Sequence, residues 1–280
     1  YEQMAILFRT NLGIRFVMDA LMKGGIPFHM KDAIPNLFAH WISLDIIAYL
    51  RLVSGTGNTR ANWLRIMNRP NRYIKREALA PFTSDISVAQ LKAYYQDKDW
   101  MLERLDRLEY DLSIMKRMSP YAAIHYLSNA MKYQDYLKDY AKEHHINEQE
   151  LLDVLNAVHE SSQSCRTFAE WFTYIDTYTE ELQKQAKSPA SKDANNESGV
   201  CLCTLHCAKG LEYPIVFIPD INEDNIPHAR AAVDADLEEE RRLFYVGITR
   251  AKEHLHLYCV GEASGKEKFP SRFLEELNEM

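Results

Sequence analysis

The sequence changes character twice along its length, and these changes limit the folds that the chain can adopt. Apolar runs of strand length occur near both ends, at residues 4–8, 26–30, 200–205 and 215–218, and residues 254–260 show the alternating pattern of a further strand. The middle, from about residue 77 to residue 192, is almost free of glycine, and its apolar residues recur with the period of a helix. We therefore predict an α/β fold in which both chain ends build one parallel sheet and an all-helical domain is inserted into it.

The links between these runs favour parallel strands. A helical pattern over residues 12–23 joins the first two runs, and a strand, helix and strand with short links form a parallel pair. Further helices are predicted at residues 40–53, 121–132, 134–143, 148–161 and 167–187. Residues 187–199 have the composition of a flexible linker. The predicted division is a sheet domain, residues 1–76 and 197–280, and an inserted helical domain with its linker, residues 77–196.

Length and composition set wide limits. At 280 residues the chain exceeds a typical single domain, so two compact units are expected. No apolar run approaches membrane-spanning length and no basic leader precedes an apolar segment, so we expect no membrane or secretory segment. Five unevenly spaced cysteines argue against a disulfide framework and indicate a reducing, cytoplasmic setting. The chain starts at Tyr1 rather than methionine, which suggests a fragment of a longer protein.

An arginine near the end of the chain falls within an apolar pattern. Residues 238–251 read EEERRLFYVGITRA, which predicts a helix capped by Asp236 with Glu239 reaching back. On that helix Arg250 lies inside the apolar arc. A buried guanidinium without a partner is costly, so an anion must meet it. The anion is either a carboxylate of the same chain or a phosphate, and the pattern leaves both open.

A local basic stretch, residues 60–76, stands on a protein whose net charge is −7. It has no acidic residue, and it contains Arg60, Arg65, Arg69, Arg72, Lys75 and Arg76 together with Trp63 and Tyr73. Positive side chains near aromatic planes suit phosphates and unstacked bases. The alternative is a solvated face whose counter-charges come from elsewhere in the fold.

Four possible metal ligands lie close together in the sequence: Cys201, Cys203, His206 and Cys207. Zinc sites usually begin with two cysteines that are two to four residues apart, whereas here a single residue separates the first pair. Alternation along an apolar strand points both of these thiols to one face of a covered sheet. We therefore predict no metal site.

Three stretches resemble motifs IV, V and VI of the UvrD/Rep-type superfamily 1 DNA helicases, in the family's order. They are AILFRTN at residues 5–11, TLHCAKGLEY at residues 204–213 and EEERRLFYVGITRA at residues 238–251. Residues 45–52 and 65–70 also resemble family sequence, whereas the helical middle is poorly matched. The resemblance implies the second RecA-like domain of such a helicase with its inserted domain, and the first RecA-like domain is expected upstream.

The same resemblance implies where ATP binds. The sequence contains no G-x-x-x-x-G-K-[ST], so the phosphate-cradling loop and the carboxylate that holds Mg²⁺ are expected on the missing domain, and the fragment alone should be inactive. ATP is expected in the cleft between the two RecA-like domains. Arg9 and Arg250 would reach the γ-phosphate as catalytic residues. Phe8 would stack on the adenine, and Glu212 would accept hydrogen bonds from the ribose hydroxyls.

The resemblance also implies contacts with DNA. The candidates for the single-stranded DNA backbone are Thr204, His206, Asn68, Arg69, Pro70 and Arg72. In family members the stretch around Arg72 runs on into a glycine-bearing turn, whereas Tyr73 follows here. The implied partners are single-stranded DNA, junctions of single- and double-stranded DNA, and the missing domain.

The implied function is the C-terminal half of an ATP-dependent DNA helicase, or translocase, that moves 3′ to 5′ along single strands. One alternative is a catalytically degenerate DNA-binding or scaffold module, although the presence of Arg9, Glu212 and Arg250 together favours the motor. Another alternative is the helicase half of a RecB-type helicase-nuclease.

Overall fold

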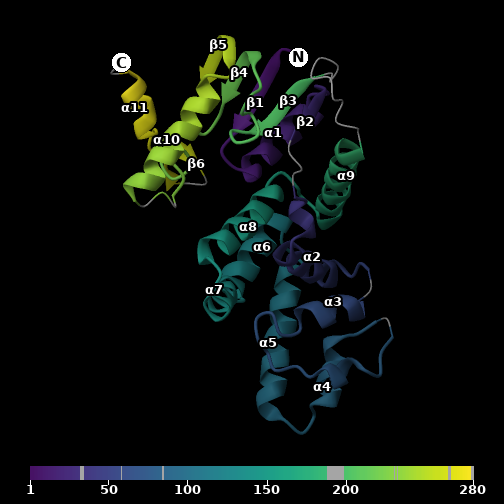
Figure 1. Ribbon diagram of the computed structural model, residues 1–280. Coiled ribbons are helices and arrows are strands. Elements are labelled where there is room, and N and C mark those ends of the chain that lie inside the picture. The colour runs from purple at the N-terminus through teal and green to yellow at the C-terminus, as the bar shows by residue number, and fades with distance from the viewer. Residues whose placement is uncertain are drawn as a thin grey trace. The chain divides into compact units, whose positions relative to one another are not determined.

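Two compact units make up the chain, and each is described by itself. The computed structural model describes residues 1–31, 35–57, 59–83, 85–187, 199–229, 231, 233–263 and 266–278. The sheet unit contains Tyr1–Pro35 and Leu182–Met280, and the helical unit contains Asn36–Glu181. Figure 1 shows the sheet with its strands drawn from both the purple start and the yellow-green end of the chain.

A five-stranded, all-parallel sheet forms the centre of the sheet unit, as the sequence predicts. Its strands, in the order β2-β3-β1-β4-β5, are β2 (Phe28–Met30), β3 (Val200–Thr204), β1 (Met4–Phe8), β4 (Tyr213–Ile218) and β5 (Ala251–Leu257). The first strand of the chain therefore lies between two strands from its far end. In this register Phe8 pairs with Thr204, and Met4 pairs with Ile215.

Among the described residues, the sheet unit also contains three complete helices and a short antiparallel pair of strands. They are α1 (Asn11–Lys23), α10 (Asp234–Ile248), α11 (Arg272–Asn278), and the antiparallel pair β6 (Glu262–Ala263) and β7 (Lys266–Glu267). Leu7 of β1 belongs to the same buried cluster as Phe244 of α10. Phe8 points to the opposite face, because side chains alternate along a strand, and a Cβ added to Gly13 of α1 would lie 3.1 Å from its ring. The two helices therefore cover opposite faces of β1.

Helix α10 approaches the segment after β3 very closely. A Cβ on Gly247 would lie 2.4 Å from Cδ2 of Leu205 and 3.3 Å from Cδ1 of Ile218. Only glycine permits this contact without rearrangement of the core, since Leu205 is fully buried. Cys201 and Cys203 lie in the same core, so the prediction that both thiols share one face is confirmed.

The helical unit is built from short helices in chain order. They are η1 (Leu37–Ala39), α2 (Trp41–Ser54), α3 (Thr59–Ile66), η2 (Arg76–Leu79), α4 (Val88–Tyr94), α5 (Asp99–Met115), α6 (Pro120–Asn129), α7 (Tyr133–His144), α8 (Glu148–Ser161) and α9 (Phe168–Lys187), the last of which continues past Glu181. Several begin at side-chain caps: the ring of His40 accepts from the Ile42 amide, and Ser87 and Gln90 form a capping box.

The division into units differs from the predicted domain boundaries at residues 36–76, which lie with the helical unit, and at residues 182–187, which lie with the sheet unit. The reason is α2, which is apolar around most of its circumference. Such a helix must be covered on several sides, and α3, α5, α6 and α8 all contact it. The predicted linker lies mostly at residues 188–198, outside the described residues.

Candidate functional site

The end of β3 and the segment that joins it to β4 carry three of the predicted site residues. Thr204 ends β3, and Tyr213 begins β4 on the other side of β1. We call residues 205–212 between them the crossover. It is fastened at its start, where the Leu205 amide donates to the Phe8 carbonyl at 2.8 Å. His206 is exposed close to Thr204, and the crossover ends at the exposed Glu212.

Glu212 and Arg250 are brought together by backbone pairing. The Tyr213 amide donates to the Arg250 carbonyl at 2.9 Å, and Nη1 of Arg250 donates to the Leu211 carbonyl at 2.9 Å. Arg250 therefore lies beside the crossover residues on both sides of Glu212. Glu212 also pairs with Lys252, whose Nζ is 3.0 Å from Oε2. The hydrogen bond and charge of Lys252, with a contribution from Arg250, lower the pKa of the Glu212 carboxyl.

The structure corrects the predicted setting of Arg250. Helix α10 starts at Asp234, so Asp236 lies in its first turn rather than at its cap, and the helix ends at Ile248. Arg250 follows that end in a turn and is half-buried rather than enclosed in an apolar arc. Periodicity therefore placed the end of the helix at residue 251, three residues too late.

Oxygen atoms of the chain hold the Arg250 guanidinium without neutralising it. Its Nε donates to the Val246 carbonyl at 2.8 Å, Nη1 to the Leu211 carbonyl, and Nη2 to the Thr249 hydroxyl at 3.0 Å. These bonds use three of the five N–H groups of a guanidinium. In the described part of the chain, no carboxylate lies within 4.0 Å of it. Two N–H groups and a full positive charge remain for an anion.

Arg9 is in the opposite situation. It follows β1, and its guanidinium donates to both carboxylate oxygens of Glu240 on α10, with Nε 2.9 Å from Oε2. The amide of His228 also donates to Oε2, at 3.1 Å. Burial acts to raise the pKa of Glu240, but these two hydrogen bonds and the charge of Arg9 outweigh it and lower the pKa. The positive charge of Arg9 is therefore matched within the chain.

Phe8 is enclosed by its neighbours, with 3% of its surface exposed. Its ring contacts the start of α1 at Gly13. An adenine could stack on this ring only if the side chain or α1 moved.

The predicted nucleotide residues lie at two different edges of the sheet. Phe8 and Arg9 stand at the carboxyl end of β1, whereas Glu212 and Arg250 directly precede β4 and β5 and stand at the amino ends of these strands. The five residues of β1 separate the edges by about 16 Å. Arg9 and Arg250 therefore stand at different edges of the sheet, and their shared contact with one phosphate stays a prediction. Thr204 and His206 lie at the same edge as Arg9.

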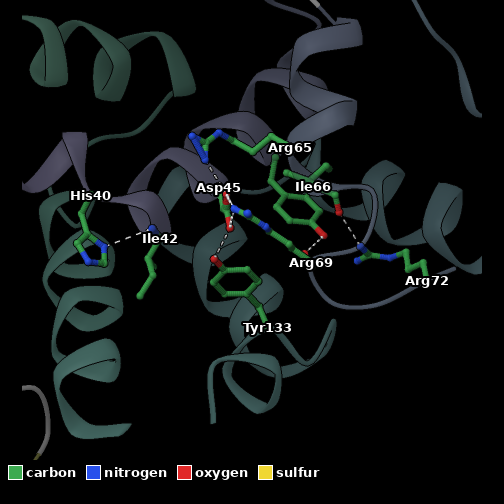
Figure 2. A network of polar contacts seen from close by, with 9 residues as sticks. His40, Ile42, Asp45, Arg65, Ile66, Arg69, Arg72 and Tyr133 are labelled. Carbon is green, nitrogen blue, oxygen red and sulfur yellow. Dashed lines mark hydrogen bonds and ion pairs between the residues drawn. The ribbon is translucent and has the colours of Figure 1, made fainter. Parts of the chain in front are cut away.

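In the helical unit, one buried carboxylate organises the basic stretch (Figure 2). Asp45 on α2 is fully buried and accepts from Nη1 of Arg69 at 2.8 Å and from Nη1 of Arg65 at 3.0 Å. The Tyr133 hydroxyl donates to its second oxygen at 2.9 Å. Burial raises the pKa of Asp45, while Arg69 and Tyr133 act to lower it. For these two arginines the counter-charge comes from elsewhere in the fold, as the alternative interpretation of the stretch stated.

The loop after α3 uses its polar groups internally. Asn68 accepts from the amides of Ile74, at 2.9 Å, and Arg72, at 3.3 Å, and its Nδ2 donates to the Ile74 carbonyl. Arg72 donates to the carbonyl of Ile66 (Figure 2). It also donates to the Pro70 carbonyl and lies over the Tyr49 ring. Asn68 therefore shapes the loop.

Trp63 of the basic stretch is 2% exposed, with its Nε1 bonded to the Ile86 carbonyl, so it cannot stack on a base. Beside the Asp45 network, a hollow of about 320 Å³ is lined by Arg65, Asn68 and Arg69 among others. Both arginines keep free N–H groups there, since only Nη1 of each bonds to Asp45.

The sequence analysis did not single out Asp45, Glu240 or Lys252. Asp45 carried a usable signal, because an acid on an otherwise apolar helix needs a cationic partner for the same reason as a buried arginine needs an anion. Glu240 lies within an acidic and basic run, and nothing in that run distinguishes it from its exposed neighbours.

No helix within the described ranges is long and apolar enough to cross a membrane. Among the same residues, no group of three or more histidine, cysteine, aspartate or glutamate side chains is arranged to hold a metal ion.

Comparison with known proteins places the chain in a family. Residues 1–261 match the UvrD-like helicase C-terminal domain, and the chain belongs to that family. It is 30% identical over 288 residues to the putative ATP-dependent DNA helicase YjcD of Bacillus subtilis, covering 99% of this chain and 36% of YjcD. It is 29% identical over 304 residues to the ATP-dependent DNA helicase PcrA of Staphylococcus epidermidis, covering 100% of this chain and 40% of PcrA. The chain thus spans less than half the length of these relatives.

Asp45→Asn should destabilise the helical unit, because the substitution removes the counter-charge of Arg65 and Arg69 and turns an amide donor toward a guanidinium. We expect the free energy of unfolding, measured by denaturant titration, to fall by about 1–3 kcal/mol. The matched control is Asp106→Asn, which removes an exposed partner of Lys92 and should change stability by less than about 1 kcal/mol. Equal effects of the two substitutions would show that the Asp45 network does not stabilise the fold.

The Arg9–Glu240 pair should make stability depend on pH in the acid range. Because the pKa of Glu240 is lowered by folding, the unfolded chain binds more protons below about pH 4.5, and acidification weakens the folded state. The contribution is present above that pH and is lost as the pH falls through the folded-state pKa.

The free energy of unfolding, measured from about pH 6 to about pH 3, should therefore fall less steeply in Glu240→Gln than in the unmodified chain. Glu239→Gln, one residue earlier and 74% exposed, serves as the control and should keep the original slope. Identical slopes in all three proteins would show that the pair is not formed in solution.

Proposed function

We propose that this chain is the second RecA-like part of an ATP-dependent DNA helicase that moves 3′ to 5′ along single-stranded DNA. Its sheet unit would present Arg250 and Glu212 to ATP bound on a separate, phosphate-loop domain. Membership of the UvrD-like helicase family and the ATP-dependent DNA helicases among its relatives support this function. Mg²⁺ would be held by the phosphate-loop domain.

The observation that carries the proposal is the state of the Arg250 guanidinium. It is fixed by three hydrogen bonds, keeps two N–H groups, and is not paired with a carboxylate in the described residues. A preorganised cation of this kind stabilises charge on a transferred phosphoryl group without reorganising during the reaction. The residues at this edge therefore fit a nucleotide phosphate.

Glu212 fits the ribose of the same nucleotide. It is exposed next to Arg250, and only its Oε2 pairs with Lys252, so Oε1 can accept a hydroxyl. ATP would supply the phosphoryl group, while Arg250 would bind its negative charge and Glu212 would orient its sugar.

Arg9 receives a different role in this proposal. Since its charge is matched by Glu240 and it stands at the other edge, we assign it to holding α10 against β1 rather than to the phosphate. Contact of Arg9 or Phe8 with the nucleotide would require this ion pair or the Phe8 packing to open.

The DNA track would use the carboxyl edge of the sheet and the helical unit. Thr204 and the exposed His206 lie at that edge. In the helical unit, Arg69 and Arg72 would meet DNA phosphates, with Asn68 and Pro70 shaping the loop that carries them. The hollow lined by Arg65 and Arg69 would bind one DNA phosphate. The two guanidiniums share the single carboxylate of Asp45, so one positive charge is left to attract the phosphate.

Arg250→Ala, made in the whole enzyme with its phosphate-loop domain, should lower the kcat of DNA-stimulated ATP hydrolysis by about 10³- to 10⁵-fold and leave the affinity for a fluorescent ATP analogue nearly unchanged. Arg250→Lys keeps the positive charge but loses the fork of guanidinium donors. The melting temperatures of both variants then show whether a loss of turnover comes from lost chemistry or from a destabilised fold.

The control is Arg242→Ala on the solvent face of α10, where the side chain is 74% exposed and pairs with Glu239. It should turn over ATP at the unmodified rate. Turnover by Arg250→Ala close to that of the control would reject the proposed role of Arg250. Failure of DNA to stimulate ATP hydrolysis by the unmodified whole enzyme would instead favour a catalytically degenerate scaffold.

A further inference from the structure

Two exposed aromatic rings in the helical unit are held together by one arginine. Tyr73 lies in the loop between α3 and η2, and Trp100 lies at the start of α5. Their side chains are 59% and 50% exposed. The Arg104 guanidinium carbon is 5.0 Å from the centroid of the Tyr73 ring and 5.1 Å from that of Trp100. Cation–π attraction to Arg104 holds both rings in place while their apolar faces stay exposed to solvent.

The backbone of Tyr73 shows that folding alone does not favour a tyrosine at this position. Its φ is 60°, in the left-handed region that glycine adopts freely and other residues adopt at a cost. The loop is nevertheless held firmly, because Oδ1 of Asn71 accepts from the Tyr73 amide at 3.0 Å and Asn68 bonds to both sides of the turn. A side chain that gains no burial and strains its backbone indicates a functional constraint.

The two rings border a cavity of about 460 Å³. Its apolar lining includes Ile74, Tyr95 and Met101, each at most 2% exposed. The Tyr95 hydroxyl accepts from the Lys75 amide at 2.7 Å, which anchors this wall to the loop. The volume falls in the range of small-ligand sites, which are mostly apolar with a few polar groups.

The charged groups of the cavity are positive. Lys75 and Lys98 line it, and none of the described lining residues is acidic. Asn68 and Asn71 also line the cavity, and their amide oxygens bond to the backbone of the loop. The complementary ligand is a flat aromatic ring that carries a hydrogen-bonding edge and a nearby negative charge.

We propose that Tyr73 and Trp100, joined by Arg104, form a binding site for an unpaired nucleobase of DNA. A base that leaves the duplex stacks on aromatic side chains whatever its sequence, and its phosphate then lies near the lysines. This inference rests on the proposed DNA helicase function. It adds a base contact to a track whose other predicted contacts are with the backbone.

The test compares single-stranded oligonucleotides that carry all their bases with oligonucleotides of the same length that contain abasic positions. Fluorescence anisotropy with the full 280-residue chain gives the affinities. Trp100→Ala should weaken binding to the base-bearing strand by about 5- to 100-fold and should leave binding to the abasic strand unchanged.

Tyr73→Gly is the second variant, because glycine adopts φ 60° without strain and the fold is therefore retained. It should weaken base-dependent binding without lowering the melting temperature. The control is Tyr110→Ala, a 64% exposed aromatic on the same helix α5 that does not line the cavity, and it should bind like the unmodified chain.

The outcomes separate this inference from the proposed function. If the unmodified chain prefers the base-bearing strand but Trp100→Ala and Tyr73→Gly bind it equally well, the base site is wrong and the helicase function stands. Equal losses on base-bearing and abasic strands would also overturn it, since the rings would then act on the backbone. If the unmodified chain binds neither strand, the DNA-binding part of the proposed function fails, and the base site fails with it.

Discussion

The crossover from β3 to β4 is the constraint on which the sheet unit depends. Parallel strands usually need a dozen or more residues to connect, whereas here β3 ends at Thr204 and β4 begins at Tyr213, which leaves eight. A segment this short must run directly across the sheet, and it does so with Leu205 and Ala208 fully buried. Helix α10 packs closely against the same segment, where Gly247 contacts Leu205. Packing therefore fixes the start of the crossover, and the hydrogen bond from the Tyr213 amide to the Arg250 carbonyl fixes its end.

This arrangement explains why one arginine is available for a phosphate and another is not. At the amino edge, Arg250 is held by carbonyl and hydroxyl oxygens, which orient a guanidinium but leave its charge intact. At the carboxyl edge, Arg9 meets a carboxylate, which cancels the charge. The crossover carries His206 near the carboxyl edge and Glu212 at the amino edge, so one short segment joins the proposed DNA contact to the proposed nucleotide contact.

The strands and the order of the elements could be predicted because each element depends on the pattern of apolar residues within its own short stretch of sequence. Apolar runs identified the buried strands β1 and β3, and α8, Glu148–Ser161, has the bounds that its periodicity predicted. The exposed strand β5 begins at Ala251, three residues before its predicted start. The partners of the charged residues could not be predicted in this way. Arg9 and Glu240 are 231 positions apart, and Asp45 and Tyr133 are 88 apart, so only the folded chain brings them together. Arg250 was wrongly placed on the helix because the apolar period does not indicate the residue at which a helix ends. It also does not indicate that backbone carbonyl oxygens accept hydrogen bonds from the guanidinium.

The central claim is that Arg250, and not Arg9, meets the nucleotide. The most direct measurement is a structure of the whole enzyme, including its phosphate-loop domain, with a non-hydrolysable ATP analogue. The account predicts the Arg250 guanidinium within hydrogen-bonding distance of the terminal phosphate, Glu212 at the ribose, and Arg9 still paired with Glu240. A structure in which Arg9 has left Glu240 for the phosphate while Arg250 stays turned to its carbonyl partners would contradict it.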